Sequence, residues 1–243
     1  MSIDIELLSK KSMEVFVKPK VTFSYEEILL GTNVNKPSGV VEQMRAIDND
    51  VWKAFHHIDN PSGIFKNYLS QNKKTILDKL SKIKSESELD NLENLLLKEI
   101  KSQLEKYKMA SYNPKTLDSY NRMRQPIDLF IENIVSMSKE LEGQRGAIVK
   151  YMFLPLGKQI FSNGFLFSEG DRNIYKLKSE SAFGDLILQS DYKKIQDKMN
   201  LLAQRVSQET GKIFYRVFLD LLWKDKYKNQ GNNLFELIPD KDN

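Results

Sequence analysis

Hydrophobic residues recur along most of this chain at steps of three and four, the spacing of one face of an α-helix. The region 62–107 shows it most clearly, since the apolar run that includes Leu80 and Ile83 is followed by a second, leucine-rich run. Between the runs, Ser85 with Glu88 three residues later has the form of a capping box. The pattern predicts an αα-hairpin over 62–107. One continuous helix is the alternative, because no glycine or proline separates the runs.

The same periodicity predicts helices in most of the remaining chain. Ser24 resembles an N-cap and Gly31 a stop signal for a helix between them. Residues 32–39 are expected to form a loop, and Pro126 is expected to kink or restart the helix that contains it. Helices are therefore predicted over residues 3–16, 25–30, 38–58, 62–107, 114–141 and 190–225, with Ser38 and Ser190 as N-caps and Gly211 as an interruption or bend in the last helix.

Residues 142–181 lack a regular period, and six glycine and proline residues fall within them. This interval is expected to hold short helices, a small β-hairpin or a surface lobe. The fold class predicted for the whole chain is all-α, with an irregular or β-hairpin insertion in 142–181. Two parts, 1–110 and 111–243, are predicted, and one continuous domain is the alternative.

Composition places limits on the protein's surroundings. The 243 residues include no cysteine, which excludes disulfides and thiol chemistry and fits a cytoplasmic, reducing compartment. No signal peptide is expected, because charged residues interrupt the first apolar stretch. No apolar run approaches the ~20 residues that a membrane helix needs, so no membrane association is expected. The net charge of +4 permits nucleic acid as a partner without arguing for it.

Catalytic and cofactor motifs are scarce. The only histidines, His56 and His57, are adjacent in a predicted helix and would point about 100° apart, so no metal site is predicted. Nucleotide-binding glycine motifs are absent, and no cofactor is expected. Two acidic-x-lysine triplets resemble an element of metal-dependent nucleases. They begin at Glu99 and Asp191, in segments predicted to be helical, where chance occurrence is the better explanation.

Basic residues are distributed unevenly. Between residues 65 and 84 there are six lysines and one acidic residue, Asp78. Phosphate groups are bound by such point charges, and the interleaved Phe65 and Tyr68 could stack on bases. A solvated helix face with the two aromatic rings in the core is the alternative. The candidate nucleic-acid-binding residues are Lys66, Lys73, Lys74, Lys79, Lys82, Lys84, Arg122 and Arg124.

Three functions are compatible with these observations. The first is a non-catalytic helical interaction subunit of a larger intracellular assembly, with a protein partner and a basic helix that could contact nucleic acid. The second is a nuclease-like enzyme that acts on DNA or RNA. The third is a sensor of a small molecule or peptide, with its pocket under residues 142–181.

Overall fold

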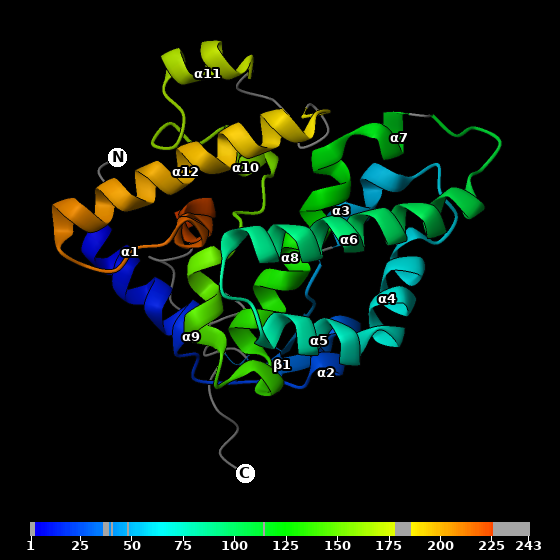
Figure 1. Cartoon of the computed structure of the whole chain (residues 1–243), viewed down its shortest axis with the longest axis horizontal. Coiled ribbons are helices and arrows are strands. Elements are labelled where there is room, and N and C mark those ends of the chain that lie inside the picture. Colours follow the sequence, from blue (N-terminus) through cyan, green and yellow to red (C-terminus); the bar gives the residue numbers. More distant parts are fainter. Residues whose placement is uncertain are drawn as a thin grey trace.

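One helix, α8 (Tyr120–Met137), runs through the middle of the protein and is enclosed by other helices (Figure 1). The structure is a computed structural model and describes residues 3–35, 39, 41–47, 49–113, 115–177 and 186–225. Every residue of α8 except Tyr120, Arg122 and Leu129 is buried. Its neighbours are α2 (Tyr25–Leu30), α6 (Glu86–Leu104), α7 (Lys115–Asp118), α9 (Arg145–Ile148) and α12 (Gln189–Thr210). The all-α prediction is confirmed.

Shorter elements complete the fold around this centre. The remaining α-helices are α1 (Ile5–Ser12), α3 (Asn49–Trp52), α4 (Pro61–Gln71), α5 (Lys73–Ser81), α10 (Lys158–Phe161) and α11 (Glu169–Tyr175). A π-helical turn (Met13–Val17) extends α1. Short 3-10 helices occupy Lys53–Phe55, Glu105–Tyr107, Lys139–Leu141, Val149–Tyr151 and Arg216–Asp225.

Local capping chemistry fixes several helix ends where the sequence predicts them. Ser24 and Glu27 form a reciprocal capping box at the start of α2. Gly31 follows α2 with a φ of 95°, and Gly211 ends α12 with a φ of 66°. Both angles are in the region that glycine adopts without steric cost. The N-cap of α12 is Leu188, not Ser190 as predicted, because Ser190 lies inside the helix. The hydroxyl of Ser85 accepts from the backbone N–H of Glu88 and begins α6.

The predicted helix over 38–58 is wrong. Strand β2 (Val41–Met44) lies there and pairs antiparallel with β1 (Thr32–Asn35), with Thr32 opposite Met44. Because β1 occupies part of residues 32–39, the predicted loop is wrong there as well. Threonine and valine favour extended chain because branching at Cβ restricts their side chains, and Gly39 has a φ of 77° between the strands. Among the described residues of 38–58, only the four of α3 are α-helical. Ser38, the predicted N-cap, is outside the described residues.

The αα-hairpin predicted over 62–107 is present with an additional break. The first arm is divided at Asn72 into α4 and α5, and α6 is the second arm. The Asn72 side-chain amide donates to the carbonyl of Tyr68, 2.9 Å away. Asparagine commonly bonds to nearby backbone in this way and so interrupts helices. The break lets α5 turn away from α4 while α6 remains packed on α4 and α8.

Residues 142–181 are irregular, as predicted. In the described part, 142–177, α9, α10 and α11 are short and no strand occurs. Met152–Leu156 form an extended buried segment, and the Gln196 amide satisfies both backbone groups of Leu154, at 3.1 and 2.7 Å. The β-hairpin considered for this interval lies instead at β1 and β2.

Two further expectations concern the chain as a whole. The helix α8 continues through Pro126 rather than restarting there. The division near residue 110 stays a prediction, although α6 and α8, on either side of it, pack together. Of the described helices, none is both long enough and apolar enough to cross a membrane.

Candidate functional site

The six lysines between residues 65 and 84 have three different environments. Lys66 is partly buried, and its pKa is lowered mainly by desolvation and secondly by the positive charge of Arg45. Lys73 pairs with Glu26 at 2.7 Å and Glu140 at 3.1 Å, so its charge serves packing between α5 and its neighbours. The other four lysines have exposed side chains; they are Lys74, Lys79, Lys82 and Lys84.

The exposed lysines of α5 do not share one face. At 100° a residue, Lys79 lies about 60° from Lys82, which directly follows α5, whereas Lys74 lies about 140° from Lys79 and about 80° from Lys82. Lys79 and Lys82 line the side of α5 that faces α6. Asp78 pairs with Lys82 at 2.7 Å, but both side chains are more than half exposed. Such surface pairs contribute little to stability and are readily exchanged.

The aromatic residues among these lysines belong to the core. Phe65 is fully buried, and its ring packs against Trp52 with centroids 4.9 Å apart. Tyr68 is partly buried against the same core. Neither ring is exposed enough for a base to stack on it. Only the positive charges of the lysines on α5 could therefore contact a nucleic acid.

Arg124 is not at the surface, contrary to its prediction as a phosphate contact. Its side chain is fully buried in α8. Its guanidinium pairs with Asp128 at 2.7 Å, with Asp90 at 3.0 Å, and with Glu93. Arg122, two residues earlier, is partly buried. Arg124 is therefore not available at the surface together with the exposed lysines of α5.

The Arg124 cluster is completed by Tyr192 and Phe153. The Tyr192 hydroxyl donates to Asp128 over 2.8 Å, and the Arg124 guanidinium lies over both rings. Burial raises the pKa of Asp128 to about 6 against the opposing effect of Arg124. Perturbed carboxyls often mark active sites, but ion pairs in a core perturb pKa values too. Here Asp128 lies on α8 itself, and Asp90, Glu93 and Tyr192 come from α6 and α12, which pack on α8, so a structural role is favoured.

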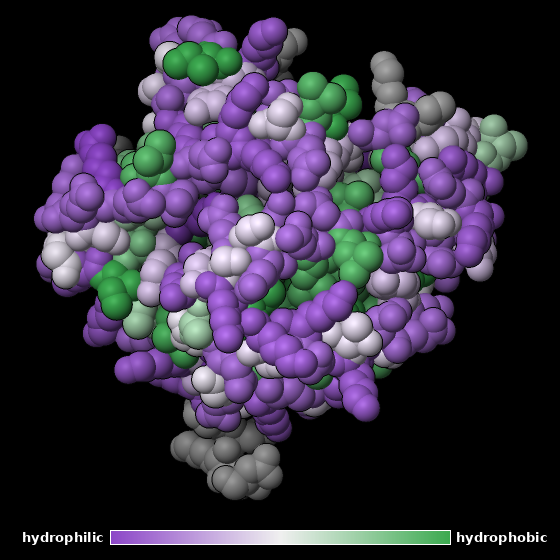
Figure 2. All heavy atoms as spheres, in the orientation of Figure 1, coloured by the Kyte–Doolittle hydropathy of each residue, from purple (hydrophilic) through white to green (hydrophobic). Residues whose placement is uncertain are grey.

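A surface groove separates α5 from α6. Figure 1 shows the two helices diverging from their connection, and Figure 2 shows hydrophobic atoms, in green, gathered between them. The groove has a volume of about 460 Å³. It is lined by Lys79, Lys82, Ile83, Glu88, Asn91, Leu92 and Leu95.

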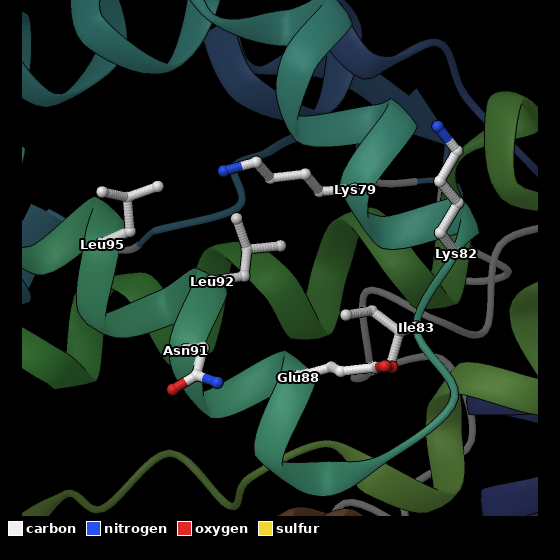
Figure 3. A pocket seen from close by; sticks show the side chains of 7 residues that line it. All are labelled: Lys79, Lys82, Ile83, Glu88, Asn91, Leu92 and Leu95. Atoms are coloured by element: carbon white, nitrogen blue, oxygen red, sulfur yellow. The ribbon is translucent and has the colours of Figure 1, made fainter.

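Apolar side chains form the floor of the groove and charged ones its edges. Leu95 is 40% exposed, whereas Leu92 and Ile83 are nearly buried. In Figure 3 the Lys79 side chain extends from α5 over the gap toward Leu92. Glu88 lies at the closed end, where its carboxylate accepts from the backbone N–H of Lys84. The groove is thus open toward Leu95 and closed at the α5–α6 connection.

Two smaller hollows are also present. One of about 220 Å³ lies at the start of α6 and includes Asp90 and Lys193, which pair at 3.0 Å. The other, of about 350 Å³, lies between Phe165 and α12, at the edge of the irregular segment. The second hollow also has an exposed apolar side chain, Phe165, and a cation, Arg205, but Arg205 pairs with Glu209 of the same hollow at 2.8 Å. The α5–α6 groove instead has two exposed lysines on one wall. The sensor hypothesis stays a prediction.

The other chemical candidates do not assemble into a site. The rings of His56 and His57 lie 3.8 Å apart, because these residues occupy a turn rather than the predicted helix. Glu99 lies on α6 and Asp191 on α12, where Asp191 pairs with Lys194. Within the described part of the chain, no three histidine or carboxylate side chains are grouped so as to hold a metal ion.

Comparison with family models, with curated proteins and with solved structures finds no match to this chain. The candidate site therefore depends on the geometry of this molecule alone. The charge pattern of the sequence indicated the lysines of α5 as site residues but did not indicate Leu95, because the exposure of Leu95 depends on the divergence of α5 from α6. A leucine at the edge of an apolar helical stripe was the only local signal.

Proposed function

We propose that the protein is a non-catalytic interaction subunit of a cytoplasmic assembly and that it binds a partner protein in the α5–α6 groove. The observation that carries this proposal is the exposed apolar floor at Leu95, bordered by Lys79 and Lys82. Apolar surface that remains exposed beside a polar rim is typical of protein-binding sites. The absence of cysteine from the sequence fits a reducing compartment.

A protein partner explains the groove better than a nucleic acid does. Phosphate contacts would use the exposed lysines but would leave the apolar floor at Leu95 in water. The neighbouring aromatic rings, Phe65 and Tyr68, are committed to the core. A protein segment can cover the floor and pair with the lysines at once.

Site-specific photo-crosslinking tests the proposal. A benzophenone amino acid replaces Asn91 at the groove, and a matched variant carries it at Leu201, an exposed leucine on α12. In the native host, we expect a discrete protein crosslink from position 91 that survives nuclease treatment and is absent from position 201. Leu95→Glu should remove it. Crosslinks to nucleic acid alone, or the same products from both positions, would contradict a protein-binding groove.

A further inference from the structure

The shape of the groove limits what can fill it. Its two walls are helices that meet at residues 82–85 and separate toward Leu95, with Leu92 between them. The α5 wall has nine residues, about 13 Å at 1.5 Å for each residue. A partner helix laid between two helices presents apolar residues at i, i+3 or i+4, and i+7. Two to three turns of such a helix would match the length of α5.

The two walls differ in charge. Lys79 and Lys82 belong to the α5 wall, while Glu88 and the neutral Asn91 belong to the α6 wall. Cations on a rim attract carboxylates on a partner, and an acidic residue against Glu88 would be repelled. Lys79 is well placed for this role, because its stem lies over the apolar floor while its amine reaches the edge (Figure 3).

From this arrangement we propose that the groove binds an amphipathic α-helix of the partner protein, with acidic residues along the edge that faces α5. This inference rests on the proposed function and specifies the partner's chemistry. The apolar row of the helix covers Leu92 and Leu95, and its carboxylates pair with Lys79 and Lys82. Its opposite edge, which faces Glu88, is neutral or basic.

Two designed peptides test this orientation by fluorescence anisotropy with the full chain. Both are 14-residue helices with leucines at i, i+3, i+7 and i+10. One carries glutamates along one edge of this row, and the other carries lysines there. We expect the glutamate peptide to bind at least tenfold more tightly. The doubly substituted Lys79→Glu, Lys82→Glu protein should reverse this preference.

Lys74→Glu is the control, because Lys74 is an exposed lysine of α5 that does not line the groove. It should leave the affinity for the glutamate peptide within about twofold. Equal binding of the two peptides, or an equal effect of Lys74→Glu and the double substitution, would overturn the inference. Failure of both peptides to bind would also overturn it, even at low salt where rim charges act most strongly.

Competition distinguishes the other occupants. If single-stranded nucleic acid, or a peptide with the chain's own residues 231–242, displaces the glutamate peptide at lower concentration than unlabelled peptide does, the groove serves that ligand instead. Loss of peptide binding on dimerisation of the protein would assign the groove to a second copy. The crosslinking experiment is independent of the peptides, so a protein crosslink from position 91 without peptide binding retains the proposed function and rejects only the acidic helix.

Discussion

The two sides of α6 face opposite environments. One side carries Asp90 and Glu93, which lie against the buried Arg124 of α8. The other carries Asn91 and Leu95, which face the open groove beside α5. Charges are thus concentrated in the interior and an apolar side chain is left at the surface. The interior charges hold α6 against α8, whereas the exposed Leu95 lies on the side of α6 that we propose binds a partner.

Removal of Arg124 should have the largest effect on stability. Arg124→Met leaves three carboxylates, those of Asp90, Glu93 and Asp128, without their shared cation in the core. Breaking a buried ion pair in this way costs about 3–5 kcal/mol. We expect the free energy of unfolding in urea to fall by about that amount. A loss below about 1 kcal/mol would show that the cluster is solvated and not structural.

The pH dependence of stability gives a second test of the cluster. Burial raises the pKa of Asp128 from its ordinary 3.8 to about 6, so the folded protein holds this proton more tightly than the unfolded chain. The stability that this group contributes is complete below about pH 4 and is lost as the pH rises through about 6. Asp128→Asn should lack this decline in urea titrations across the same range.

A matched aspartate separates this effect from the general titration of carboxyls. Asp191 lies on α12 and pairs with Lys194 near the surface, so Asp191→Asn should retain the decline of the unsubstituted protein. Equal pH profiles for Asp128→Asn and the unsubstituted protein would mean that Arg124 keeps Asp128 ionised throughout. The cluster would then be a fixed ion pair rather than a proton-binding one.

Local patterns predicted much of the fold because they depend on short-range physics. Ser24, Ser85 and Gly211 act within a few residues of themselves, as capping rules require. The predicted helix after Ser38 failed because strand pairing between Thr32 and Met44 is a contact that no helical period reveals. Propensity is readily overridden by such tertiary contacts.

The candidate site shows the same limit. Asp128 lies four residues after Arg124, so their pairing could be read from the sequence. The other two partners, Asp90 and Glu93, come from α6, more than thirty residues away. Without them, Arg124 and Lys79 look alike as surface cations. Burial by the surrounding helices, which the sequence does not state, separates them.

Lys73 offers an intermediate test within α5. Its amine pairs with Glu26 and Glu140, and its side chain is 30% exposed. Partly exposed pairs contribute at most about 1 kcal/mol. We expect Lys73→Met to lower the free energy of unfolding by roughly 0.5–1 kcal/mol, with a smaller loss at high salt. A loss that does not depend on salt would point to packing of the lysine stem instead.

Lys79→Met should have the smallest effect on folding, although it is the substitution closest to the groove. The side chain is exposed, and surface changes usually alter stability by less than about 0.5 kcal/mol. The affinity for the glutamate peptide, in contrast, should fall clearly, since loss of the Lys79 charge removes a pairing site for the partner's carboxylates. Urea unfolding and peptide anisotropy on the same sample would measure both quantities. If Lys79→Met destabilised the fold as much as Lys73→Met, Lys79 would be a packing residue. The groove beside α6 would then contribute to folding stability, as the buried Arg124 cluster on the opposite side of α6 does, and would not be reserved for binding.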